Sequence, residues 1–230
     1  HPRVRRQRQM CIRDSARTVD PSVYERNKEA ADSENKYVVH CMNTGRLCAF
    51  TDKGKMHQIR VLDLPCGKFR DKGTPIDNVS NYSSSEEQII MICDAEQMRF
   101  SQLLFATAQG MVKKVDGKEF QVSKRTTAAT KLQEEDALVS VQVITENQHI
   151  VLQTKNGYFL RFPAAEVPEK KKAAIGVRGI RLQKKDVLEN VYLFQEGTET
   201  KVIYGKKTVT LNRLKTAKRD GTGTKTRQAD

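Results

Sequence analysis

The chain has 230 residues, and its 41 lysines and arginines against 28 aspartates and glutamates give a formal charge of +13, which favours a polyanionic partner such as nucleic acid. Hydrophobic residues make up 37% of the sequence, enough for the core of one large or two small domains. Because no apolar run approaches the roughly 20 residues of a membrane span and no signal-peptide pattern opens the chain, we expect a soluble, intracellular protein without a membrane partner.

The first 15 residues hold five arginines and one aspartate, a net charge of +4, without amphipathic periodicity. One interpretation is a basic arm for a nucleic-acid backbone. The stretch from Arg8 to Ser15 also resembles a read-through translation that recurs at the ends of sequences assembled from short reads. We therefore expect residues 1–15 to be a non-native or disordered end. The remaining residues, 16–230, carry +9.

Two signatures recur along residues 37–230. The first is T-x-x-G at 51–54, 107–110 and 154–157, with the glycines 56 and 47 residues apart. Each copy lies between two strand-like segments, which predicts a hairpin whose glycine takes a positive φ. The second signature, L-Q-x-x-D-x-L-x-x-V, begins at Leu132 and again at Leu182. A unit of about 50 residues is therefore repeated.

The repeated unit is rich in β-structure, because period-2 alternation recurs between Gly, Asn and Asp while long helical periods are absent. Four strands in 40–50 residues are typical of a propeller blade. We therefore predict an all-β, propeller-like fold of about three full blades plus partial blades at both ends. The predicted blades cover about 37–100, 101–147, 148–196 and 197–230, and residues 16–36 are expected to be the remnant of a preceding blade.

Basic residues return at fixed offsets from the repeat glycines. A pair stands 14–16 residues after each glycine, and a comparable pair lies in the last unit: Lys68 and Arg70, Lys124 and Arg125, Lys171 and Lys172, Lys218 and Arg219. A second set lies just beyond the turn: Lys113, Lys114, Arg161, Lys206 and Lys207. Solubility does not require such a period. In a radial fold these residues are expected on one rim, where they can follow the phosphates of bent DNA.

Other sites are disfavoured by the sequence. Gly176-x-x-Gly179 lacks the helices of a KH domain, and Gly221-Thr222-Gly223 lacks the strand and helix of a dinucleotide site. His40, His57 and His149 have no plausible ligand partners, so no metal site is expected. The five cysteines contain no C-x-x-C pair, which favours free buried thiols over disulfides or a zinc knuckle: Cys11, Cys41, Cys48, Cys66 and Cys93.

Three segments resemble a known family. They are Gly176-Val177-Arg178-Gly179-Ile180-Arg181-Leu182, the T-x-x-G turn followed by Val112-Lys113-Lys114, and Arg125-Thr126-Thr127-Ala128-Ala129-Thr130-Lys131-Leu132. Together they look like the C-terminal β-pinwheel of the A subunits of bacterial DNA gyrase and topoisomerase IV. The resemblance covers about 18–227. It implies strand exchange between neighbouring blades and a basic rim that binds and bends duplex DNA, and it adds Arg178 and Arg181 to the expected contacts.

The resemblance also implies partners and a location. It implies a breakage-reunion domain upstream in the same polypeptide, a B subunit in an A2B2 holoenzyme, and a cytoplasmic enzyme associated with the chromosome. The breakage tyrosine belongs to the upstream domain and the ATPase site to the B subunit, so this segment is expected to be inactive alone and to hold no cofactor, with ATP and Mg²⁺ used elsewhere in the holoenzyme.

One departure narrows the expected role. Gyrase A domains carry a basic box rich in Gln and Gly, expected here after a strand containing Tyr24, but residues 25–31 have no paired glycines and a charge near zero. This favours a topoisomerase IV-like role in relaxation and decatenation over gyrase. The alternative from a different class is a protein-interaction propeller whose basic rim binds an acidic partner.

Overall fold

A computed structural model describes residues 7–12 and 15–226, without the side chains of 7–12. Residues 1–6 and 13–14 of the expected non-native end, and 227–230 of the expected last blade, lie outside the described residues. The chain divides into two compact units, His1–Phe100 with Lys118–Ala129 and Ser101–Gly117 with Thr130–Asp230. Within the described residues, no helix is long and apolar enough to cross a bilayer.

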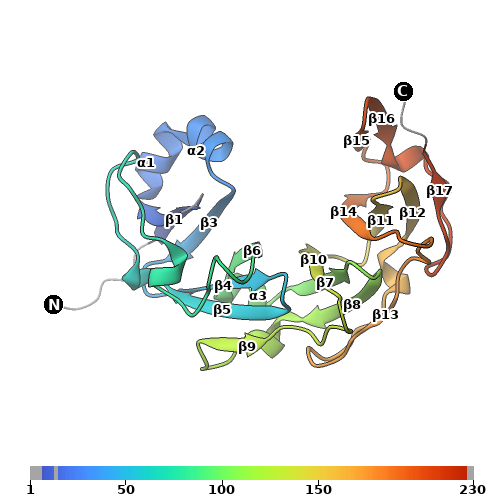
Figure 1. Cartoon of the computed structure of the whole chain (residues 1–230). Helices are drawn as coiled ribbons and strands as arrows, with labels where there is room; N and C mark the ends of the chain where they lie inside the picture. Colours follow the sequence, from blue (N-terminus) through green and yellow to red (C-terminus); the bar gives the residue numbers. More distant parts are fainter. Residues whose placement is uncertain (1–6, 13–14, 227–230) are drawn as a thin grey trace. The chain divides into compact units, whose positions relative to one another are not determined.

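The first unit contains a three-stranded antiparallel sheet in the order β2-β1-β3. Its strands are β1 (Gln7–Ile12), β2 (Ala16–Val19) and β3 (Tyr37–Met42). Thus part of the segment expected to be non-native or disordered is paired on both sides. Two short helices connect β2 to β3, α1 (Pro21–Arg26) and α2 (Lys28–Glu34), and they bury Tyr24 and Ala31 together with Val19 (Figure 1).

The second sheet of this unit has four strands in the order β6-β4-β5-β9. They are β4 (Arg46–Thr51), β5 (Lys55–Arg60), β6 (Ile89–Asp94) and β9 (Thr126–Ala128). Their connections contain the short 3-10 helices η1 (Val61–Asp63) and η2 (Ile76–Asn78) and helix α3 (Ala95–Arg99). Ala16 and Cys41 of the first sheet share one core with Leu47, Ile59 and Ile92 of the second, so the two sheets pack face to face.

The second unit repeats the four-stranded arrangement twice. One sheet has the order β10-β7-β8-β13 and the other β14-β11-β12-β17. The strands of the first are β7 (Gln102–Thr107), β8 (Met111–Asp116), β10 (Leu138–Ile144) and β13 (Val177–Arg178). Those of the second are β11 (Gln148–Thr154), β12 (Tyr158–Pro163), β14 (Leu188–Gln195) and β17 (Thr224–Lys225).

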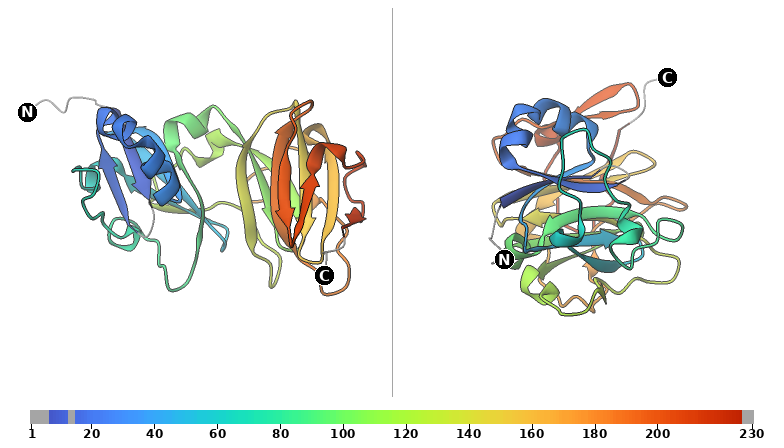
Figure 2. Two further views of the ribbon diagram at one scale, coloured as in Figure 1. Left: turned by 90° about the horizontal axis from the view of Figure 1, so that it is seen from above. Right: turned by 90° about the vertical axis from the view of Figure 1, so that its left-hand side faces the viewer.

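The last described element of the repeat is a hairpin of β15 (Lys201–Tyr204) and β16 (Lys207–Thr210). The 3-10 helices η3 (Gly117–Phe120), η4 (Ala164–Glu166) and η5 (Leu211–Arg213) follow the second strand of their hairpins. Leu104 and Ile150 belong to a core shared by the two sheets, and Phe159 and Tyr204 to a core shared with the hairpin. In Figure 2 the hairpin, in red, lies beside the orange strands of the last sheet.

The predicted hairpin turns are present. The glycines that end the T-x-x-G signature have positive φ, with values of 70° at Gly54, 82° at Gly110 and 83° at Gly157. Gly205 in the last hairpin has φ 61°. Residues with a Cβ atom are strained in this region, which is why glycine recurs at the turn. At Gly157 a Cβ atom would also lie 2.5 Å from the hydroxyl oxygen of Tyr204.

The fourth strand of each four-stranded sheet comes from the following repeat. After β9, β13 and β17, the next backbone N–H donates to the carbonyl of the turn glycine one repeat earlier: Ala129 to Gly54 at 2.7 Å, Gly179 to Gly110 at 2.7 Å, and Thr226 to Gly157 at 2.8 Å. This is the exchange that the family resemblance implied. The predicted blades were consecutive segments of the chain, whereas the sheets combine strands from different segments. For example, β3 of the predicted blade 37–100 pairs with β1, which lies in residues 1–15.

Candidate nucleic-acid interface

The basic pairs found by spacing lie at one structural position. Lys124 and Arg125 immediately precede β9, and Lys171 and Lys172 lie in the loop that leads to β13. Lys218 and Arg219 lie in the loop that leads to β17. Each loop therefore enters a sheet built mainly from the preceding repeat. Lys124, Arg125, Lys171 and Lys218 are exposed, while Lys172 and Arg219 are half-buried.

The first unit has a further loop of this kind. Lys68 and Arg70 are exposed in the segment after η1, which contacts β2 through isolated bridges of Cys66 to Thr18 and Thr74 to Ala16. The backbone N–H of Lys68 donates to Asp71 at 2.7 Å. Arg70 also lines a cavity of roughly 240 Å³ together with Arg17 and Lys72. The ammonium and guanidinium groups here are therefore presented next to β2, as the other pairs are next to β5, β8 and β12.

The second basic set divides in two. Lys206 in the turn of the last hairpin and Lys207 at the start of β16 are exposed. Lys113, Lys114 and Arg161 were expected on an exposed rim, but their exposed fractions are only 1%, 7% and 7%. The reason is that β8 and β12 are inner strands, covered by the loop of the next repeat. Offset along the chain does not distinguish an outward from an inward side chain.

Two of the buried members donate from their side chains to the protein's own backbone. Lys113 donates from Nζ to the carbonyl oxygens of Lys171 at 3.2 Å, Lys172 at 2.8 Å and Ala174 at 2.6 Å. The Arg161 guanidinium donates to the carbonyls of Asn212 at 2.6 Å and Leu214 at 3.2 Å.

Arg178, Arg181 and Arg219 surround one acid that the sequence analysis did not identify. The Nε and Nη2 atoms of Arg178 donate to the two carboxylate oxygens of Asp220, and Nη2 of Arg181 lies 4.0 Å from the same carboxylate. The hydrogen bond from Arg178 and the nearby positive charges hold the pKa of Asp220 below its usual range. The signal that could have found Asp220 is its place: it stands 15 residues after Gly205, where Arg125 and Lys172 follow their own glycines.

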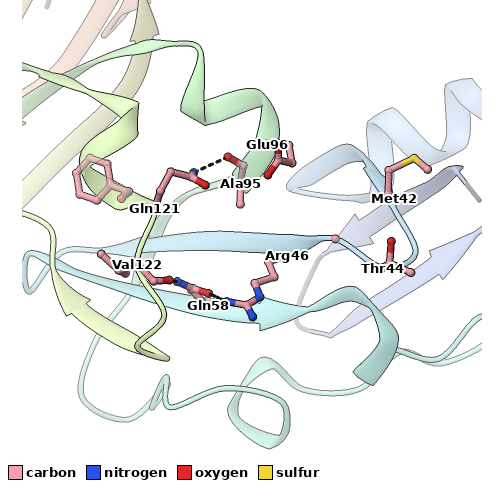
Figure 3. Close-up of a pocket in the computed structure, with 10 residues that line it drawn as sticks. Met42, Thr44, Arg46, Gln58, Ala95, Glu96, Gln121 and Val122 are labelled. Atoms are coloured by element: carbon pink, nitrogen blue, oxygen red, sulfur yellow. Dashed lines mark hydrogen bonds between the residues drawn. The ribbon is translucent and has the colours of Figure 1, made fainter. Parts of the chain in front are cut away.

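The first unit also has a cavity of roughly 620 Å³ beside the loop that precedes β9 (Figure 3). Gln58 on β5 crosses one side of it, accepting from Arg46 at 3.0 Å and donating to the carbonyl of Val122 at 2.6 Å. Gln121 on the other side donates to the carbonyl of Ala95 at 3.0 Å. These hydrogen bonds hold the loop that presents Lys124 and Arg125 against the rest of its unit.

Two of the histidines contact neighbouring side chains of the protein. His57 contacts Glu87 at 2.9 Å and Thr126 at 2.9 Å, and His149 accepts from Arg161 at 3.2 Å. Among the described residues, no group of three or more His, Cys, Asp or Glu side chains could hold a metal ion.

Cys41 and Cys48 are buried as expected, whereas Cys93 is half-buried and Cys66 is exposed. Burial and the neighbouring Asp94 raise the pKa of Cys48 to about 12. The side chain of Cys11 lies outside the part of the chain that the structure describes.

Comparisons with known proteins agree with the repeat architecture. The family described as "DNA gyrase C-terminal domain, beta-propeller" matches residues 101–145 and 148–195. The DNA gyrase A protein of Lawsonia intracellularis is 34% identical over 198 residues, covering 80% of this chain and 24% of the relative. The DNA gyrase A protein of Metamycoplasma arthritidis is 31% identical over 172 residues, covering 74% of this chain and 19% of the relative.

The same architecture is found in solved structures. The C-terminal domain of DNA topoisomerase IV has a TM-score of 0.85 at 22% identity, covering 97% of this chain and 73% of that one. The E. coli ParC C-terminal domain has a TM-score of 0.77 at 17% identity, covering 96% and 94% of the two chains.

The chain belongs to the family of C-terminal β-pinwheel domains of gyrase A and topoisomerase IV A subunits.

This pinwheel spans about a quarter or less of the curated relatives that it matches. Its sheets confirm the predicted fold of three four-stranded blades with partial blades at both ends. Tyr24, expected on a strand, lies in helix α1, and its hydroxyl donates to Asp32 at 2.8 Å. The place where a glycine-rich basic box was expected is therefore occupied by the two short helices α1 and α2.

Proposed function

We propose that this pinwheel binds duplex DNA through the exposed basic loops that enter its exchanged strands. The observation that carries the proposal is the equivalence of these loops: Lys124 with Arg125, Lys171 with Lys172, and Lys218 with Arg219 each precede the strand that completes a sheet of the preceding repeat. Lysine and arginine at such positions neutralise phosphates and release counterions, so the binding is independent of sequence.

The proposed biological role is that of a C-terminal domain in a type II topoisomerase A subunit. Bound and bent DNA is presented as the segment that the holoenzyme passes through a double-strand break. Breakage chemistry is assigned to an upstream domain and ATP hydrolysis, with Mg²⁺, to a B subunit. The holoenzyme acts on the chromosome in the bacterial cytoplasm. Membership of the family supports each of these assignments.

Within this family we favour a topoisomerase IV-like role. The support is local: α1 and α2 lie where a wrapping box would follow Tyr24, and residues 25–31 contain no glycine. With ATP, a holoenzyme containing this chain should decatenate linked circles and relax supercoiled plasmid, and it should introduce no negative supercoils into relaxed plasmid. Negative supercoiling above the relaxed state would instead assign a gyrase role.

The DNA-binding proposal is tested by reversing charge in two loops. The variant Lys124→Glu, Arg125→Glu, Lys171→Glu, Lys172→Glu should lose duplex binding while its circular dichroism is unchanged. The matched control reverses four exposed lysines outside these loops: Lys28→Glu, Lys53→Glu, Lys155→Glu and Lys184→Glu. Both variants change the net charge equally, so a loss confined to the loop variant identifies the loops. Equal affinities of the loop variant and the unaltered chain would refute the proposal, whereas no duplex binding by the unaltered chain would favour an acidic protein partner.

A further inference from the structure

Each four-stranded sheet uses a buried polar side chain to hold the loop supplied by the next repeat. These side chains stand three or four residues after the turn glycine, on the second strand of the hairpin. Gln58 holds the carbonyl of Val122, Lys113 those of Lys171, Lys172 and Ala174, and Arg161 those of Asn212 and Leu214. The acceptors in 121–125 and 171–174 lie in loops that carry exposed basic residues. Those at 212 and 214 lie in and directly after η5, next to the exposed Arg213 and Lys215.

Of these three side chains, Lys113 makes the most hydrogen bonds to backbone carbonyls of the next repeat. An ammonium group has three N–H donors, and three backbone carbonyls of the 171–174 loop accept from it. The side chain is 1% exposed, and its Nζ lies 5.4 Å from the centroid of the Phe105 ring. A buried ammonium without partners is strongly destabilising, so opening this loop costs the hydrogen bonds and leaves the charge unpaired. The loop conformation and the burial of Lys113 are therefore coupled.

Two of the three acceptors are the carbonyls of Lys171 and Lys172 themselves. Lys113 therefore holds the backbone of the same two residues whose side chains are proposed to bind phosphates. The loop is further held by the N–H of Lys170, which donates to the carbonyl of Lys114 at 2.8 Å, and by Thr130, whose hydroxyl donates to Ala174 at 3.3 Å. Because the backbone that carries these two ammonium groups is already fixed, less conformational entropy is lost when they bind phosphates.

We propose that Lys113 is a positioning residue for DNA binding: it holds the Lys171-Lys172 loop in its binding conformation without contacting DNA. This inference rests on the proposed function. It assigns to Lys113 a different role from a direct phosphate contact on an outer rim. Arg161 and Gln58 are expected to act in the same way on the segments of the next repeat whose carbonyls accept from them.

The test is a double-mutant cycle in the full chain, measured as affinity for a duplex of about 40 base pairs. Lys113→Met removes the ammonium, Lys171→Gln with Lys172→Gln removes the two proposed contacts, and the third variant combines all three changes. Losing two phosphate contacts should lower affinity roughly tenfold. We expect Lys113→Met to lower it by a similar factor, and the combined variant to bind within about twofold of the double variant.

Hydrogen exchange provides the second readout. The N–H of Ala174 donates to the carbonyl of Lys171 at 3.0 Å, and its protection should fall in Lys113→Met. Lys155→Met is the matched control, because it removes one exposed positive charge outside the basic loops and should change neither Ala174 exchange nor affinity by more than about twofold. If Lys113→Met does not fold, Lys113→Gln retains two donors without the charge, and the same cycle applies.

The outcomes separate the inference from the proposed function. Additive losses in the combined variant, with unchanged exchange at Ala174, would show that Lys113 contacts DNA directly and would overturn the inference alone. Unaltered affinity in Lys113→Met, while Lys171→Gln with Lys172→Gln weakens binding, would also overturn it and leave the proposed function standing. If the unaltered chain does not bind duplex DNA, both are wrong.

Discussion

The carboxylate of Asp186 accepts a hydrogen bond from the backbone N–H of Asn156 at 3.0 Å, 30 residues earlier in the chain. Asp136 makes the same contact with Gln109 at 2.9 Å. Each aspartate is the D of L-Q-x-x-D, and each amide lies in a T-x-x-G turn. The two repeated signatures of the sequence therefore belong to one structural feature. The loop that carries the aspartate caps the T-x-x-G turn of the same repeat.

Replacing Asp186 tests this capping interaction. The carboxylate also accepts from the N–H of Val187 at 2.9 Å, so Asp186→Ala leaves two amide donors without their acceptor. We expect a loss of about 1–3 kcal/mol in the free energy of unfolding. Asp186→Asn retains an acceptor at the same place and should cost less than half as much. Urea denaturation of the three proteins measures both differences, and equal losses in the two variants would contradict the assignment.

The turn glycines give a second prediction, with an internal control. Gly157 has φ 83°, and a Cβ atom there would lie 2.5 Å from the hydroxyl oxygen of Tyr204 and 2.8 Å from the carbonyl oxygen of Thr226. Gly197 has φ 88° but no heavy atom within 4 Å of such a Cβ. Gly197→Ala therefore measures backbone strain alone, about 1 kcal/mol. Gly157→Ala should cost at least about 1 kcal/mol more in thermal or urea denaturation, and an equal cost would mean that strand exchange does not depend on this close approach.

A third prediction concerns acid stability. Burial raises the pKa of Glu87, but hydrogen bonds from Thr51 and His57 and the charge of Lys55 outweigh it, so the pKa lies below its ordinary value of 4.5. The unfolded chain then binds this proton more tightly than the folded one. The resulting stability is present above pH 4.5 and is lost as the pH falls through the folded-state pKa.

Glu87→Gln removes this contribution. The difference in unfolding free energy between Glu87→Gln and the unaltered chain should be largest near pH 7 and should shrink as the pH falls below about 4.5. Denaturation at a series of pH values between 3 and 7 measures it. A constant difference over that range would show that Glu87 does not supply the acid dependence.

The ion pair of Arg178 with Asp220 yields a fourth prediction, which rests on the proposed function. Asp220→Asn releases Arg178 and Arg181 from a carboxylate that would compete with DNA phosphates for them, so duplex affinity should rise about two- to tenfold. Asp63→Asn is the control, because Asp63 makes the same bidentate pair with Arg60 at 2.8 Å outside the arginine cluster around Asp220. A larger gain in Asp63→Asn would contradict the role of the arginine cluster.

The repeats were predictable because they are carried by local chemistry. The turn glycines and the alternation of β10 are visible in the sequence, and so is the offset of Lys124 and Lys171 from their glycines. The burial of Lys113 and Arg161 could not be predicted in the same way, because it depends on which loop covers β8 and β12, and that loop comes from the next repeat. Asp220 was missed because its significance lies in being surrounded by arginines brought together by the strand exchange.

The most direct test of the central claim is the salt dependence of duplex binding. The logarithm of the binding constant should fall linearly with the logarithm of salt concentration, by about 0.9 for each phosphate contacted. The neutral variant Lys124→Gln, Arg125→Gln, Lys171→Gln, Lys172→Gln should therefore have a slope about 3–4 units shallower than the unaltered chain. An unchanged slope would contradict the claim that the loops entering the exchanged strands are the DNA-binding surface.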